Sequence, residues 1–198
     1  MRNKTSKVGK VWRGASAAWG REIGFTLVEM LMALAVLAIL AMQAIPSMAA
    51  WVSKVRLSSA ADQFFQSLAL ARNEAIKRNT RTVVCKSAAG SVCDLTGSWQ
   101  WGWIVFVDVN GNAQVDDGDQ ILFRQAALGG NIRFDGNTNV AKYVSYSPNG
   151  TSKMVGGAVQ MGTFTICMAS GTPTDARKLM LSKPGQVRVE KTVVESCQ

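Results

Sequence analysis

Six acidic and amide side chains with regular spacing lie within one short segment, residues 108–119. Oxygen atoms of such side chains are the ligands that calcium prefers, and their order approaches that of a calcium-binding loop. Two positions depart from that loop, because Ala113 replaces a glycine and Asp119 replaces a bidentate glutamate. We interpret the segment as a polar hairpin turn, with weak calcium binding as the alternative. The residues concerned are Asp108, Asn110, Asn112, Gln114, Asp116 and Asp119.

Histidine is absent from the whole sequence. It is the usual general base of enzymes and the commonest metal ligand, and the sequence has neither a glycine-rich phosphate loop nor a nucleophile elbow in its place. Catalysis would therefore depend on carboxylates or on a free cysteine. We expect no enzyme activity, no cofactor and no metal beyond the calcium alternative.

The four cysteines, an even number, indicate two disulfides if they are exported to an oxidising compartment. Cys85 and Cys93 are close enough to close one loop, and Cys167 with Cys197 would connect the C-terminal end to a strand. Four cysteines allow three pairings, of which we favour this one.

Three tryptophans alternate at Trp99, Trp101 and Trp103, and they share one face if the segment is a strand. Aromatic side chains on one face can stack on the bases of single-stranded nucleic acid. Such a stripe more often packs against a helix or between sheets, and this is our interpretation.

Glu29 is the one charged residue in an apolar run of 21 residues from Phe25 to Ile45. As a helix this run is long enough to cross a bilayer core. A carboxylate at the bilayer centre costs roughly 2.5–3.5 kcal/mol, so we expect it to have a function. Residues 1–24 hold six basic residues and one acid, against 16 basic and 12 acidic residues in the rest of the chain. This order predicts a cytoplasmic N-terminus and an exported C-terminal part.

Helical spacing continues beyond the apolar run, so we expect one long helix with a membrane-spanning half at 25–45 and an amphipathic half at 46–79. Pro46 predicts a kink between the halves. The apolar positions of the second half are Trp51, Val55, Phe64, Phe65, Leu68, Ala71, Ala75 and Ile76.

Residues 80–198 show alternating apolar residues and glycine-rich turns, which predict short antiparallel strands. The expected fold class is α+β, a long kinked helix packed on an antiparallel β-sheet domain. The expected strands are 81–86, 99–108, 120–124, 131–134, 143–146, 163–168, 178–181 and 186–193.

The segment GFTLVE at residues 24–29, after a basic leader and before an apolar helix, resembles the class III leader of type IV pilins and type II secretion pseudopilins. The resemblance implies that a prepilin peptidase cleaves between Gly24 and Phe25 and methylates the new N-terminal Phe25. It also implies that Glu29 pairs with the α-amino group of a neighbouring subunit, which compensates the charge in lipid and fixes the register between subunits. A plain signal anchor is the alternative.

Pieces of the remaining chain resemble, in order, the GspH/FimT (FimU) group of minor pilins and pseudopilins. This implies a type IV pilin-like fold and a structural subunit at the inner membrane with a periplasmic β domain. It would meet other pilins and an assembly platform, and help to initiate or cap a filament of a type II secretion system or a type IV pilus. The similar pieces are SAADQFFQSLALARNEAIKRN, VVCK, WQWGWIVFVDVNGN, DDGDQILFR, SYSPNG, FTIC and ARKLMLSKPGQVRV.

Lys183, Arg188 and Lys191 form a basic cluster around the turn at 184–185. Some FimT-like proteins bind DNA at a similar tail through Gly-Arg-x-Arg, whereas residues 185–188 of this chain read GQVR and lack the first arginine. DNA capture for natural transformation is therefore an alternative function, and a solvated strand end is the interpretation that we favour.

Overall fold

The structure is a computed structural model that describes residues 24–169 and 173–197, without the side chains of residues 43–47. The expected leader thus lies outside the described residues apart from Gly24. Contacts divide the chain into two compact units, residues 1–45 and residues 46–198. Pro46 lies at their boundary, and the kink that it suggests stays a prediction.

Helix α1 (Leu27–Arg78) has 52 residues and contributes to both units. Its ends lie within two residues of those expected from the sequence. Basic residues in its last turn, Lys77 and Arg78, favour the C-terminal end of a helix electrostatically. Asn79 then adopts a φ of +51°, the left-handed conformation that commonly ends a helix. Among the residues that the structure describes, no helix has both the length and the apolar character that crossing a membrane requires.

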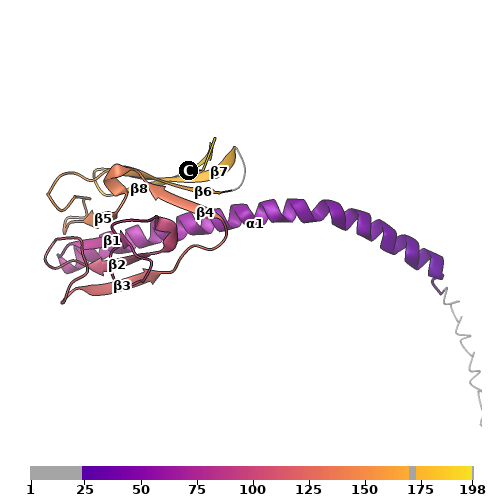
Figure 1. Ribbon diagram of the computed structural model, residues 1–198, viewed down its shortest axis with the longest axis horizontal. Helices are drawn as coiled ribbons and strands as arrows, with labels where there is room; N and C mark the ends of the chain where they lie inside the picture. The colour runs from indigo at the N-terminus through magenta and orange to yellow at the C-terminus, as the bar shows by residue number, and fades with distance from the viewer. Residues whose placement is uncertain (1–23, 170–172, 198) are drawn as a thin grey trace, which may run out of the picture. The chain divides into compact units, whose positions relative to one another are not determined.

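The unit of residues 46–198 contains two four-stranded sheets that pack against the second part of α1 (Figure 1). The strand orders are β3-β2-β1-β5 and β4-β6-β7-β8, and every pair is antiparallel. The antiparallel arrangement and the α+β class are as expected, whereas the division into two sheets was not anticipated. The strands are β1 (Thr82–Lys86), β2 (Trp103–Val107), β3 (Gln120–Gln125), β4 (Ile132–Gly136), β5 (Tyr143–Tyr146), β6 (Gly162–Met168), β7 (Thr174–Leu181) and β8 (Val187–Val194).

One face of α1 forms the centre of the core in this unit. Its buried residues recur every three or four positions, which places them on one side of the helix. Phe64 makes edge-on contacts with four aromatic rings at centroid distances of 4.7–5.1 Å. Because Trp103 belongs to one sheet and Phe134 and Phe164 belong to the other, Phe64 holds the two sheets against the helix. The rings belong to Trp99, Trp103, Phe134 and Phe164, and the buried helical residues are Leu57, Ala60, Ala61, Phe64, Leu68, Ala71 and Ala75.

The segment expected to be a strand from Trp99 begins instead with a short 3₁₀ helix, η1 (Trp99–Trp101). Gly102 follows with a φ of +116°, and a Cβ there would lie 2.5 Å from the carbonyl oxygen of Gln125, so this turn requires glycine. The three tryptophans therefore do not share one face. Trp99 and Trp103 are buried against α1, as interpreted, but Trp101 is 53% exposed.

Candidate functional site

The predicted processing site lies directly before the start of α1. Thr26 occupies the N-cap position, and its hydroxyl accepts a hydrogen bond from the backbone N–H of Glu29 at 3.2 Å. In return, the backbone N–H and hydroxyl of Thr26 donate to Oε2 of Glu29 at 3.0 and 3.1 Å. This reciprocal arrangement is a capping box, which stabilises the first turn of a helix. Glu29 therefore has a local partner in the subunit, and the Thr-x-x-Glu spacing was a sequence signal for it that we missed.

The backbone before this cap is open to solvent. A Cβ placed on Gly24 would meet no atom within 4 Å among the described residues, and Phe25 is exposed. Among the residues that the structure describes, none shields the peptide bond between Gly24 and Phe25.

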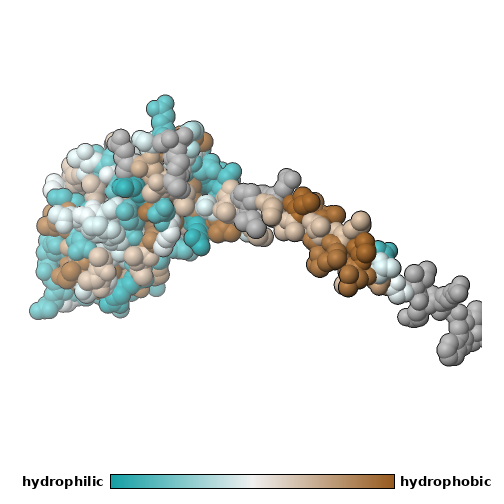
Figure 2. Space-filling model, turned by 45° about the vertical axis from the view of Figure 1, so that its right-hand side comes forward, coloured by the Kyte–Doolittle hydropathy of each residue, from teal (hydrophilic) through white to brown (hydrophobic). Residues whose placement is uncertain are grey.

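Apolar side chains cover the first part of α1 (Figure 2). The large apolar residues from Phe25 to Met42 are each 56–81% exposed, and Glu29 is the one charged residue in this range. A continuous apolar surface of this kind is unfavourable in water.

The loop that connects β2 to β3 contains the acidic and amide residues of 108–119. Asp108 is buried, and its carboxylate accepts hydrogen bonds from the backbone N–H groups of Gly111, Asn112 and Ala113. These bonds hold Ala113 at a φ of +58°, where a glycine would be expected. Backbone hydrogen bonds to the Asp108 carboxylate therefore hold the loop in its conformation.

The remaining side chains of this loop also bond to one another. Asp116 accepts hydrogen bonds from the side-chain amides of Asn110 and Asn112, which hold the pKa of Asp116 below its usual value. Asp119 accepts from the backbone N–H groups of Val109 and Asp116. Within the described part of the chain, no three His, Cys, Asp or Glu residues are grouped so that they could hold a metal ion. The hydrogen bonds within the loop are those of a polar hairpin turn.

The four cysteines form two disulfides, Cys85–Cys93 and Cys167–Cys197, with Cα atoms 5.6 and 5.8 Å apart. This is the pairing favoured from the sequence. The first closes the loop that follows β1, and the second fixes the C-terminal tail to β6.

The basic residues near the C-terminus do not converge on one surface. Arg188 and Lys191 are three residues apart on β8, and since side chains alternate along a strand, they point to opposite faces. Their neighbours on β7 are Met180 and Arg177, respectively, and Lys183 lies in the turn between the two strands. The cluster that the sequence suggested is divided by the sheet.

Family models and solved structures give these features a context. The model of the type II transport protein GspH matches residues 60–185, which is more than half of the chain. The model of the prokaryotic N-terminal methylation motif matches residues 19–42, which include Gly24, Phe25 and Glu29. The chain belongs to the GspH family. It is thus a minor pilin or pseudopilin, a structural subunit of a type II secretion system or a type IV pilus.

Crystal structures of the type IV minor pilin FimU from Pseudomonas aeruginosa share the fold. One crystal form has a TM-score of 0.54 and 19% identity and covers 75% of this chain and 99% of FimU. A second form has a TM-score of 0.51 and 21% identity, with coverage of 72% and 100%. The minor pseudopilin EpsH from the type 2 secretion system of Vibrio cholerae has a TM-score of 0.46 and 12% identity, with coverage of 69% and 97%. No curated protein sequence matches the chain.

Proposed function

We propose that this subunit is cut between Gly24 and Phe25 by a prepilin peptidase, methylated on Phe25 and anchored in the inner membrane by residues 25–45. Before the cut, residues 1–24 face the cytoplasm, and residues 46–198 face the periplasm both before and after it. The observation that carries the proposal is the continuous exposed apolar surface of 25–42, which starts at the proposed new N-terminus and contains one charge. Beyond Met42 the segment continues with Gln43, Ala44 and Ile45, none of which is charged.

The charge of Glu29 supplies the docking interaction in this proposal. Both hydrogen bonds from Thr26 go to Oε2, and the described residues offer no hydrogen-bond donor to Oε1. Hydrogen bonds from Thr26 satisfy one oxygen but do not neutralise the carboxylate. In lipid, the α-amino group of a neighbouring processed subunit removes this uncompensated charge and fixes the axial register of the two helices.

The subunit would enter the filament at the inner-membrane assembly platform and help to initiate or cap it. Family membership supports this role, since GspH-family members are structural subunits. The absence of catalysis is part of the same proposal. The exposed helix supplies contacts with lipid before assembly and with other pilin helices afterwards.

Mass spectrometry of the native N-terminus tests the processing step. We expect a chain that begins with N-methylated Phe25 in cells with an active prepilin peptidase, and the uncut chain when the peptidase is deleted. A chain that still begins with Met1 in the wild-type cells would leave a simple signal anchor and refute the proposal.

Two substitutions separate the docking role of Glu29 from its capping role. Glu29→Gln keeps an acceptor suited to a capping box but removes the charge, whereas Thr26→Ala keeps the charge and removes the N-cap hydroxyl. We expect Glu29→Gln to be processed normally and to be lost from purified filaments, while Thr26→Ala is retained. Equal loss of both variants would assign the effect to the helix start instead of the charge.

A further inference from the structure

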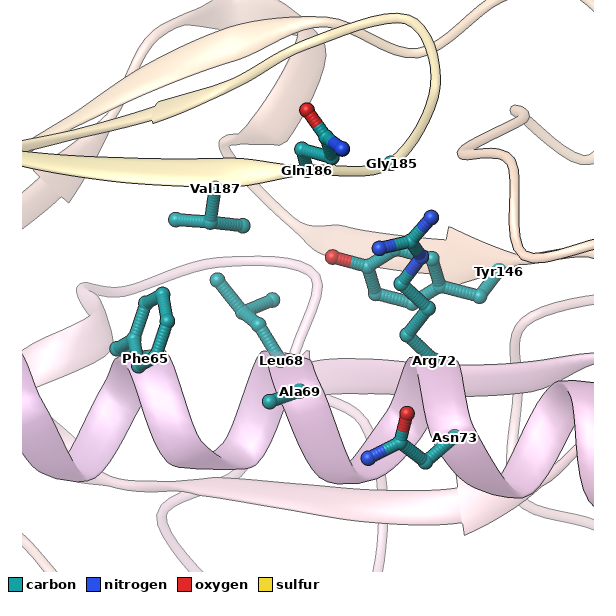
Figure 3. A pocket seen from close by; sticks show the side chains of 9 residues that line it. All are labelled: Phe65, Leu68, Ala69, Arg72, Asn73, Tyr146, Gly185, Gln186 and Val187. Atoms are coloured by element: carbon teal, nitrogen blue, oxygen red, sulfur yellow. The ribbon is translucent and has the colours of Figure 1, made fainter.

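A cavity of about 290 Å³ lies between α1 and the turn that precedes β8 (Figure 3). Phe65, Leu68 and Val187 give it an apolar wall, and Arg72 and Tyr146 provide polar groups toward its other end. None of its lining residues is acidic. The cavity therefore offers an apolar surface next to hydrogen-bond donors and a positive charge.

The hydroxyl of Tyr146 has no hydrogen-bond partner among the described residues. The side chain is 0% exposed, and Figure 3 shows the phenol oxygen directed toward the space between Leu68 and Gln186. Burial raises the pKa of Tyr146, an effect that the charge of Arg72 opposes only in part, so the hydroxyl keeps its proton at neutral pH. A buried donor without an acceptor is costly, so an acceptor that enters the cavity from outside the described residues would stabilise this hydroxyl.

Arg72 is the second polar side chain at this cavity, and it lacks an ion-pair partner among the described residues. Its Nε and Nη2 atoms donate to the backbone carbonyls of Gly150 and Pro184 at 2.9 and 3.1 Å. Those bonds fix the half-buried guanidinium in place but do not neutralise it, and the ion pairs within the described residues involve other side chains. A carboxylate would neutralise the charge of Arg72 and accept a hydrogen bond from the hydroxyl of Tyr146.

We propose that this cavity is a carboxylate site that receives the Glu or Asp side chain of a neighbouring subunit. The methylene groups of such a side chain fit the apolar wall, and its carboxylate is opposite in charge to Arg72. Two donors in an open cavity bind a free carboxylate weakly, whereas a side chain on a subunit held in the same filament is present at an effective concentration of the order of millimolar. This occupant rests on the proposed function, although the chemistry of the site does not.

Sodium butyrate tests that chemistry without a filament. The full processed chain in detergent micelles is titrated with butyrate, and the backbone amide NMR signals of Gly185 and Gln186 are followed. We expect saturable shifts with butyrate and none with neutral butyramide. Tyr146→Phe should weaken binding by about tenfold to a hundredfold, the value of one hydrogen bond to a charged group. Tyr143→Phe is the matched control and should bind like the wild type, because Tyr143 lies outside the cavity lining. Absence of saturation, or equal shifts with butyramide, would overturn the proposal.

Filament incorporation tests the identity of the occupant. We expect fewer copies of Tyr146→Phe than of Tyr143→Phe in filaments from the native host, at equal cellular levels of the two variants. If butyrate binds as expected but Tyr146→Phe incorporates as well as the control, the neighbouring subunit as occupant is refuted. If the wild-type chain is itself absent from filaments, the proposed function fails, and the butyrate result still decides whether the site binds carboxylates.

Discussion

Replacing Tyr146 by phenylalanine should stabilise the unit of residues 46–198. The substitution keeps the buried ring and removes a hydroxyl that has no partner among the described residues. An unsatisfied buried donor costs about 1–3 kcal/mol, and the small void left by one oxygen atom offsets part of the gain. We therefore expect the free energy of unfolding to rise by about 1 kcal/mol. A subunit that sacrifices stability at a binding site is consistent with the carboxylate proposal.

The difference between the two proteins should grow in alkaline solution. Burial raises the pKa of Tyr146 in the folded state above its unfolded value. The stability that this contributes is fully present below the unfolded pKa of about 10, and it is lost as the pH rises above that value. The wild type should therefore lose about 1.4 kcal/mol per pH unit above pH 10 relative to Tyr146→Phe, in which the group does not titrate.

Urea unfolding followed by tryptophan fluorescence measures both effects, since Trp99 and Trp103 are buried in this unit. Tyr143→Phe serves as the control, because the Tyr143 hydroxyl accepts a hydrogen bond from the backbone N–H of Val155 at 3.1 Å. Its loss should lower the free energy of unfolding by about 0.5–1 kcal/mol. If Tyr146→Phe were also less stable than the wild type, with an unchanged m-value, the hydroxyl would have a partner in the fold and the reasoning would be refuted.

Two further predictions concern the core and the basic tail. Phe64→Ala should lower the free energy of unfolding by about 3–5 kcal/mol, because it removes a fully buried ring that contacts both sheets, whereas Phe65→Ala, at 38% exposure, should cost much less. A similar cost for both in urea titrations would mean that the position of Phe64 between the sheets is not decisive. The DNA-capture hypothesis predicts that the chain is retained on duplex DNA at low salt and that Arg188→Ala reduces the salt slope by about one. Elution of the wild-type chain without retention would exclude that function.

Local periodicity in the sequence predicted most of the helices and strands, but not which of their side chains are buried by neighbouring elements. Each strand of the structure overlaps an expected one, because alternation and glycine turns are local signals. Along α1, the buried face includes Ala60 and Ala61, whereas Trp51 and Val55 are exposed. A tryptophan has more apolar surface to bury than an alanine, but the described side chains of the helix are fully buried only from Leu57 onward, and small residues permit close packing there.

The same distinction explains which site residues could be found from the sequence. The leader motif and the capping motif both lie within six consecutive residues, 24–29, so a local sequence pattern contains both. The cavity combines Arg72 on α1 with Tyr146 on β5 and the turn before β8, and no spacing rule links residues that far apart. The sequence predicted a strand at 143–146, but the lack of an acceptor for the Tyr146 hydroxyl among the described residues becomes evident only when every neighbour is in place. The two contact sites proposed for this subunit therefore differ in how the sequence encodes them. The one on the helix follows from a local motif, whereas the one on the folded domain is assembled by the tertiary structure.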